Sequence, residues 1–389
     1  MGPMGDDAVA WVRAQRGPME ALLRALVEES SYTLDPRGVD AAGAVLREAI
    51  PLRCRAVPGE RYGAHLFFEG RRPAGDGGVV LVGHHDTVFP REVFSGYRSE
   101  GDVAWGPGVL DMKGGLVVMA FALRALDAAG ELDRVPLTMA VVADEEVGSP
   151  ESGPWLQQAA RGAAVALVFE AGREGDAIIT RRKGTLAMTA RAIGRAAHAG
   201  NAHAQGASAI RAMARFIESA EALNGYASGV TINVGTVHGG TSKNTVPAQC
   251  VAEIDGRFER ADDGVSLVSR LRDLVRSPLV EGTSVVLEGG IARAPLERWE
   301  ESARWMQRYG GCQRLAGLGV AESPLQGGGS DASTTASVGV PSIDGLGPRG
   351  SGFHTLDERV ELDSLVPKCE ALVRFLLGVG GDGFSPPSA

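Results

Sequence analysis

The sequence is poor in cysteine. Its 389 residues contain four cysteines, at Cys54, Cys250, Cys312 and Cys369, and no two of them form a CxxC pair. This spacing argues against a disulfide framework and against a zinc site built from thiolates. Reduced thiols in a cytoplasm fit the pattern better.

Long apolar runs and an excess of positive charge are also missing. The run in "GGLVVMAFAL" ends at Arg124, too short for a membrane span. The first residues, "MGPMGDDAVAWVRAQRG", have neither the basic nor the apolar region of a secretion signal. A net charge of -9 and a pI near 5.4 argue against nucleic acid and anionic membranes as partners. We therefore expect a soluble, cytoplasmic protein.

The motifs of several enzyme classes are absent as well. The sequence has no GxSxG elbow of a serine hydrolase and no Walker lysine loop. "GLGPRG" matches GxGxxG formally, but it contains Pro348 and precedes no helical pattern. It indicates a turn-rich loop and not a dinucleotide site.

The stretches that are present predict an α/β fold. The apolar runs "GVVLVGHH", "VPLTMAVVADEE" and "AVALVFEAG" read as buried strands, and "KGGLVVMAFALRALDAAG" reads as a helix between two of them. Strands that alternate with helices favour a mixed, largely parallel sheet flanked by helices. The chain is long enough for two domains.

The middle of the chain follows a different pattern. From about Thr185 the order strand-helix-strand-strand-helix-strand is typical of a ferredoxin-like α+β domain. The first type of pattern resumes after about Pro295. We predict a metal-binding catalytic domain at residues 1–184 and 296–389, with an inserted lid and dimerisation domain at residues 185–295.

Polar residues follow the predicted strands at their carboxyl ends, where ligands bind in open α/β sheets. In "GHHDTVFP", His84 and Asp86 share one face of the strand and His85 points to the other. A metal-bound imidazole commonly donates its second N–H to a carboxylate, so this pair suits a metal site. For His85 we expect a structural role.

Five segments contain candidate metal ligands. They are "GHHD", "GPGVLDMKGG" with Asp111, "ADEEVGS" with Glu145 and Glu146, "VFEAG" with Glu170, and "SGFHTLDE" with His354. Each segment taken alone has a plainer interpretation, as a helix cap, a solvated acidic pair or a surface histidine. Their position at the ends of apolar strands, where an unpaired charge is costly, favours a metal site. Two histidines and three carboxylates, one of them shared, would satisfy two zinc-like ions.

The ordered set of motifs resembles a known family. "GHHDTVFP", "GPGVLDMKGG", "DEEVGS", "GRAAHAG" and "GGGSDAS" are similar, over nearly the whole chain, to the dinuclear zinc family of glutamate carboxypeptidase, acetylornithine deacetylase, succinyl-diaminopimelate desuccinylase and aminoacylase. The bacterial glutamate carboxypeptidase branch is the most similar. The resemblance implies two Zn²⁺ ions per chain, although the same ligands accept Co²⁺ or Mn²⁺.

The resemblance also implies a role for each matching residue in the metal centre. One ion would be held by His84 and Glu170, the other by Glu146 and His354, and both by Asp111. Asp86 would orient His84, and Glu145 would be the general base that activates water.

In the insert, the resemblance implies that His198 of "GRAAHAG" reaches the active site of a partner subunit and stabilises the oxyanion, so we expect a homodimer. Four further residues would bind substrate. Asn244 and Arg257 match substrate-contacting positions, Gly328 lies in a loop that would bind the same α-carboxylate, and Arg293, with Lys183 in reserve, is the candidate for a side-chain carboxylate. The alternative for Arg257 is an ion pair with Asp255 or Glu253.

The resulting expectation is hydrolysis of an amide bond next to a free α-carboxylate. The substrate would be an N-acyl amino acid or a short peptide, with glutamate as the favoured product. An N-acyl-amino-acid deacylase, similar to acetylornithine deacetylase, is the alternative within enzymes. A catalytically silent binding protein is the alternative from another class, although every candidate ligand and the base are present.

Overall fold

A computed structural model describes residues 3–381 of the chain, which divide into two compact units. The first unit runs through Arg181 and also takes in Arg298–Leu325 and the chain from Ser330 onward. The second unit is Arg182–Glu297 together with the short segment Gln326–Gly329. The sequence pattern did not indicate that this segment would join the second unit.

The first unit contains a six-stranded sheet in the order β1-β2-β6-β3-β7-β14. Its strands are β1 (Arg53–Val57), β2 (His65–Glu69), β3 (Val79–His84), β6 (Leu137–Val142), β7 (Val165–Val168) and β14 (Ser342–Ile343). β3 is parallel to β6 and β7, and β14 is parallel to β7, whereas β1 and β2 are antiparallel. The predicted mixed, largely parallel sheet is confirmed.

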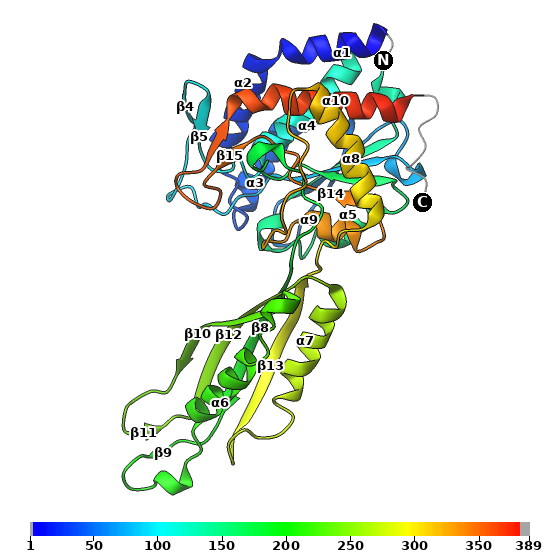
Figure 1. Cartoon of the computed structure of the whole chain (residues 1–389). Coiled ribbons are helices and arrows are strands. Elements are labelled where there is room, and N and C mark those ends of the chain that lie inside the picture. Colours follow the sequence, from blue (N-terminus) through cyan, green and yellow to red (C-terminus); the bar gives the residue numbers. More distant parts are fainter. Residues whose placement is uncertain (1–2, 382–389) are drawn as a thin grey trace. The chain divides into compact units, whose positions relative to one another are not determined.

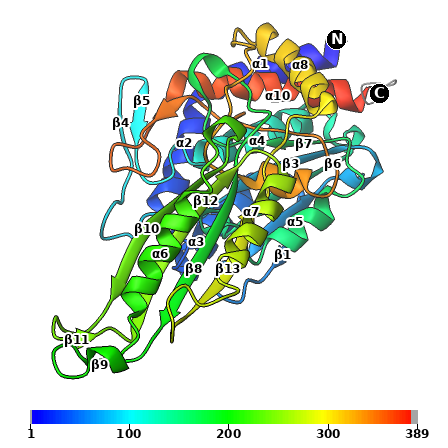
Figure 2. The same cartoon turned by 60° about the horizontal axis from the view of Figure 1, so that its bottom comes forward.

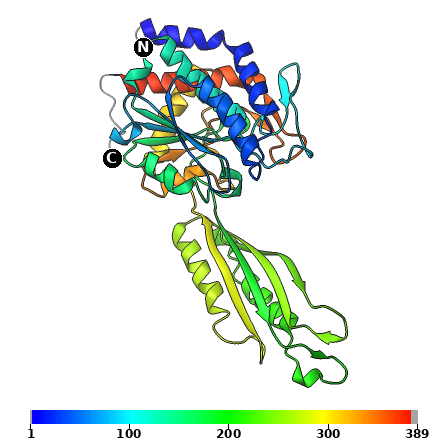
Figure 3. The same cartoon turned by 180° about the vertical axis from the view of Figure 1, so that it is seen from behind.

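Helices cover both faces of this sheet (Figures 1 and 3). They are α1 (Pro3–Arg13), α2 (Arg16–Glu28), α3 (Pro36–Ala49), α4 (Lys113–Ala128), α5 (Gly153–Ala160), α8 (Glu300–Leu315), α9 (Asp331–Ala336) and α10 (Leu365–Gly380). The apolar α4 packs against β3 closely enough that a Cβ at Gly83 would lie 2.9 Å from the Leu116 side chain. Only glycine allows this approach of helix to strand, which contributes to a continuous apolar core.

A smaller antiparallel sheet lies beside the large one in the same unit. It contains β4 (Arg98–Glu100), β5 (Val103–Trp105), β15 (Gly350–Ser351) and β16 (Arg359–Glu361), in the order β15-β16-β5-β4. The pairing of β16 with β5 brings the segment before Arg359 next to the segment after Trp105. Two loops that are about 250 residues apart in sequence thereby become neighbours.

The second unit is a four-stranded antiparallel sheet with two helices (Figure 2). Its elements are β8 (Gly184–Ile193), α6 (Ala209–Glu221), β10 (Thr231–Gly239), β12 (Gln249–Phe258), α7 (Ala261–Asp273) and β13 (Ser284–Arg293). The sheet order β10-β12-β8-β13 is that of a ferredoxin-like domain. In β8 the even-numbered residues from Leu186 to Ala192 are buried, because both helices pack on one face of the sheet.

A two-stranded ribbon completes the second unit. It is formed by β9 (Ala197–His198) and β11 (Thr245–Val246). No helix between residues 3 and 381 is long and apolar enough to cross a membrane. The four cysteines are free thiols.

Candidate metal centre

The carboxyl ends of three parallel strands place most of the predicted ligands. His84 is the last residue of β3 and is in register with Val142, at the end of β6. Glu145 and Glu146 follow β6 in a short 3-10 turn, and Glu170 follows β7. Because neighbouring parallel strands end at the same edge of the sheet, these side chains meet there.

Two overlapping groups of side chains have the composition of metal sites. The first contains His84, Asp111 and Glu170, and the second contains Asp111, Glu146 and His354. Within each group, one ligand atom of every residue lies within 4.8 Å of the others. All five predicted ligands are therefore brought together, and Asp111 belongs to both groups.

The distances show how Asp111 lies between the two histidines. Its Oδ1 is 3.3 Å from His84 Nε2, and its Oδ2 is 3.3 Å from His354 Nε2. His84 Nε2 is also 3.8 Å from Glu170 Oε1, and His354 Nε2 is 3.1 Å from Glu146 Oε2. A bridging carboxylate with one histidine on each side is a suitable arrangement for two ions.

Asp86 contacts the ring nitrogen of His84 that does not face the other candidate ligands. The Nδ1 of His84 lies 3.0 Å from the Asp86 carbonyl oxygen and 3.3 Å from its Oδ1, which leaves Nε2 for a metal. The Asp86 carboxylate also accepts hydrogen bonds from Thr33 Oγ1 and from the backbone N–H groups of Glu145 and Glu146. It therefore positions the ligand histidine and the acidic turn together. The contribution of Thr33 was missed, since nothing in its local sequence distinguishes it.

His85 lies on the opposite side of the strand from this centre. It is fully buried, and a Cβ at Gly43 of α3 would lie 3.4 Å from its Nε2. Neither ring nitrogen has a hydrogen-bond partner among residues 3–381. Burial lowers the pKa of His85 to about 4, so the ring is neutral at pH 7.

The electrostatics of the centre favour a bound cation. Burial, together with neighbouring carboxylates, raises the pKa of Glu146 to about 8 and that of Glu170 well above its ordinary value. Hydrogen bonds to Asp111 and Glu146 raise the pKa of His354 to about 10. These pKa shifts arise because several carboxylates lie close together in a site that is removed from water. A divalent cation would relieve this repulsion, and the nitrogen and oxygen donors present suit zinc. The residues therefore fit the metal that the sequence implies.

One buried carboxylate beside the centre was not predicted. Glu358 is 1% exposed and accepts backbone hydrogen bonds from Gly108, Leu110 and Asp111 at 2.9, 3.0 and 3.0 Å. Its only signal in the sequence was its position in "HTLDE", four residues after His354. Its partners lie about 250 residues earlier, so no local pattern indicates them.

In the second unit, the structure places His198 beside Asn244. His198 is exposed on β9 and pairs with Thr245 of β11. Its Nδ1 accepts hydrogen bonds from the N–H groups of Gly200 and Asn201, both at 3.1 Å. The hydrogen of a neutral His198 ring is therefore on Nε2, where it is available for donation.

The predicted carboxylate-binding residues lie at the other end of the same sheet. Arg257 of β12 and Arg293 of β13 are both in register with Thr185 of β8. Arg257 donates to both carboxylate oxygens of Asp255, at 2.9 and 2.8 Å, and to the Gly327 carbonyl at 3.4 Å. The ion pair considered as an alternative for Arg257 is thus present.

Two further cations of this region contact the backbone. Lys183 donates to the Gly229 carbonyl at 3.0 Å. Arg182, which the sequence analysis did not single out, is buried and donates to the Gly328 carbonyl at 3.2 Å. The segment Gln326–Gly329 is therefore held by arginines on two sides, and Gly327 and Gly328 stay exposed.

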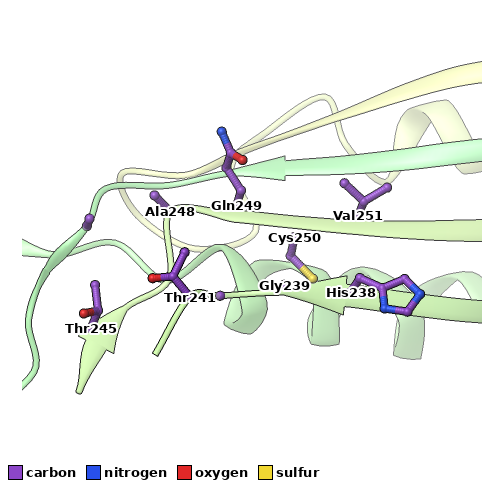
Figure 4. A pocket seen from close by; sticks show the side chains of 10 residues that line it. His238, Gly239, Thr241, Thr245, Ala248, Gln249, Cys250 and Val251 are labelled. Atoms are coloured by element: carbon purple, nitrogen blue, oxygen red, sulfur yellow. The ribbon is translucent and has the colours of Figure 1, made fainter. Parts of the chain in front are cut away.

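A separate hollow of about 360 Å³ lies on the second unit, near the ends of β10 and β12 (Figure 4). His238 and Cys250 are its titratable lining residues, and Thr241, Thr245 and Gln249 supply polar atoms. The lining contains no carboxylate. Without a carboxylate, it lacks the acidic ligands and the general base that the candidate centre of the first unit contains.

A hydrolase that uses bound metal is the class of protein consistent with this fold and this arrangement of ligands. Residues 80–378 match the family described as Peptidase family M20/M25/M40. The chain belongs to that family.

Relatives and solved structures agree with this assignment. Carboxypeptidase G2 of Pseudomonas sp. (strain RS-16) is 27% identical over 368 residues, which cover 92% of this chain and 88% of that protein. A succinyl-diaminopimelate desuccinylase of Cereibacter sphaeroides is 26% identical, covering 81% of this chain and 86% of that protein. The crystal structure of a tripeptidase from Staphylococcus aureus has a TM-score of 0.80 at 20% identity, with 94% of this chain and 98% of that chain covered. The last likeness concerns the fold alone.

Proposed function

We propose that the protein is a dinuclear zinc amidohydrolase that releases a C-terminal amino acid, glutamate first, from an N-acyl amino acid or a short peptide. The observation that carries this proposal is the pair of ligand groups sharing Asp111. Similarity to a carboxypeptidase and to desuccinylases supports a substrate with an amide bond and a free carboxylate.

The ligands divide between two ions. His84 and Glu170 would hold one ion and Glu146 and His354 the other, with Asp111 between them. The ions, when bound, supply Lewis acidity that makes a water molecule acidic and polarises the scissile carbonyl. Co²⁺ or Mn²⁺ would be held by the same donors.

Glu145 would act as the general base. Its backbone N–H donates to Asp86, and the next residue, Glu146, would be a metal ligand, so the turn would bring the Glu145 carboxylate near the water that reacts. It would take the proton from water and pass it to the leaving amine. Asp86 keeps the Nδ1 hydrogen of His84 in place throughout.

The dimensions of the second unit support a dimer in which His198 serves the partner subunit. Arg257 and Arg293 align with Thr185 at the start of β8, whereas the β9–β11 ribbon with His198 and Asn244 follows Ile193 at its end. Eight residues of extended strand span roughly 27 Å. One acylated amino acid cannot reach both ends within one chain, so each substrate would use residues from two chains.

Specificity would depend on the cationic end of this sheet. Arg257 and the backbone N–H groups around Gly328 would bind the α-carboxylate, with Asp255 giving way to the substrate or orienting the guanidinium. Arg293, with Lys183 in reserve, would bind a side-chain carboxylate. An N-acyl-amino-acid deacylase that acts on acetylated ornithine is the second candidate, supported by a 26% identical acetylornithine deacetylase over 266 residues. The four free thiols suit the cytoplasmic location that we propose.

The test is amino-acid release from a panel of N-acyl glutamates, N-acetylornithine and neutral dipeptides, with and without a chelator. We expect chelator-sensitive release of glutamate, and a loss of about tenfold or more in kcat/KM for glutamate substrates in Arg293→Ala. Release of ornithine or neutral amino acids alone would keep the metal mechanism and refute the glutamate assignment. Release from no member of the panel would favour a catalytically silent scaffold.

A further inference from the structure

The loop that carries Asp111 is wrapped around a single buried side chain. Gly108 donates to Glu358 Oε2, and Leu110 and Asp111 both donate to Oε1. Three backbone donors within four residues share this carboxylate, and such charge-assisted bonds are stronger than neutral ones. The third donor is the backbone N–H of Asp111, the residue whose carboxylate belongs to both ligand groups.

The pairing of two short strands brings Glu358 to this loop. β16 begins at Arg359, which is in register with Trp105, the last residue of β5. Glu358 therefore stands opposite the start of the loop at Gly106–Asp111. His354, a ligand of the second group, precedes Glu358 by four residues in the same β15–β16 connection. The segment from His354 to Glu358 thus supplies one candidate ligand, His354, and holds the backbone of another, Asp111.

The far end of the loop has its own anchor. Lys113, the first residue of α4, is fully buried and donates to the carbonyl of Glu29 at 3.0 Å. At the first anchor, Gly108 has a φ of 75°, and a Cβ there would lie 2.6 Å from the Thr87 side chain. The loop has little room to shift, so the cradle around Glu358 decides the direction in which Asp111 points.

We propose that Glu358 is the positioning residue for Asp111, holding the shared carboxylate between the two ligand groups so that both ions bind. This inference rests on the proposed metal centre, and Glu358 itself touches neither ion nor substrate. Both of its oxygens accept N–H groups of the loop, and it belongs to neither ligand group.

The test is zinc affinity, measured by competition with a chelator in the absence of substrate. The variant Glu358→Gln has the same shape, but its amide NH₂ must face either Gly108 or the Leu110 and Asp111 donors. We expect a loss of zinc affinity of about tenfold or more, with a lower kcat and little change in KM. Glu358→Asp keeps the charge and shortens the reach, so it should lose affinity as well and carries the test where Gln prevents folding.

Asp176→Asn is the matched control. Asp176 is also a buried carboxylate of the first unit, and it belongs to neither ligand group. It accepts a backbone hydrogen bond from Gly319 and pairs with Arg349 at 3.2 Å and Lys368 at 3.3 Å. The Asp176→Asn substitution should lower the Tm and leave zinc affinity unchanged. A Glu358→Gln protein that lost Tm but bound zinc like wild type would overturn this inference alone. A wild-type protein that bound no zinc would overturn the proposed function with it.

Discussion

Adjacent residues in this protein differ sharply in what surrounds them. His84 faces two carboxylates of the candidate centre, and His85, the next residue, is fully buried next to Gly43 of α3. Glu146 lies beside His354, whereas Glu145, the residue before it, is the proposed general base. The alternation of side chains along extended backbone produces the first contrast. The second depends on a short turn.

Replacing Glu145 should separate catalysis from metal binding. Glu145→Ala removes the proposed base but none of the five ligands, so we expect kcat to fall about 10²–10⁴-fold with zinc content unchanged. Steady-state kinetics and elemental analysis measure the two quantities. The control is Glu151→Ala. It removes another carboxylate of the same stretch of sequence, one that accepts hydrogen bonds from the backbone N–H groups of Glu60 and Arg61. A Glu145→Ala enzyme with near-normal turnover would refute the assignment.

Replacing His85 should have no catalytic effect. The variant His85→Leu substitutes an apolar side chain for a neutral ring whose nitrogens have no partner among residues 3–381. The free energy of unfolding should stay within about 1 kcal/mol of wild type or rise, because a buried polar group without a partner is removed. Urea denaturation and zinc analysis test this, and His84→Leu, which should lose zinc, is the contrast. Loss of zinc from His85→Leu would show that the wrong histidine was assigned.

At the scale of elements, a group of ion pairs links the first helix of the chain to the last. In the first unit, Arg13 at the end of α1 donates to Glu370 of α10 at 2.8 and 2.9 Å, and Arg374 of α10 donates to the same carboxylate. Burial alone would raise the pKa of Glu370, but these hydrogen bonds lower it below its ordinary value. The cluster of Arg13, Glu370 and Arg374 thus links α1 to α10.

Stability from this cluster should depend on pH. Because the pKa of Glu370 is lower in the folded than in the unfolded chain, its contribution is complete above the unfolded value of about 4.3 and is lost as pH falls further. Glu370→Gln should therefore cost about 1 kcal/mol of unfolding free energy at pH 7, and the difference from wild type should narrow below about pH 4. Urea denaturation at pH 7, 5 and 3.5 measures it, with the exposed Glu100→Gln as control. A difference that did not change with pH would contradict the assignment.

For the whole molecule, the second unit raises the question of which chain completes a site. His198 and Asn244 lie at one end of its sheet and the arginines at the other. If His198 acts in the partner's site, two inactive variants can complement each other. A chain with Glu145→Ala still supplies His198, and a chain with His198→Ala still supplies Glu145.

Co-expression of these two variants should restore activity. Random pairing makes half of the dimers mixed, with one complete site in each, so about a quarter of the wild-type rate is expected. Each variant alone is the control. If His198 instead acted within its own chain, every site in the mixture would lack one group and no activity would return.

The sequence alone predicted the fold class, and the candidate ligands that it named lie together in the folded chain. Apolar runs and period-two alternation are local patterns, so the strands β3, β6 and β7 and the ferredoxin-like order of the second unit could be recognised from them. Ligands that follow strands could be located for the same reason. Family membership confirms the resemblance on which their roles rest.

Other features were decided only by tertiary structure. The sequence could not indicate that Glu358 would cradle a loop about 250 residues away, that Thr33 would donate to Asp86, or that Gln326–Gly329 would join the second unit. It also left open whether Arg257 pairs with Asp255. In the folded chain these two residues do pair. Each of these depends on backbone groups and side chains that meet only when distant strands pair. Local periodicity records which face of an element is buried, but the partner on the other side of a contact is set by the packing of the whole chain.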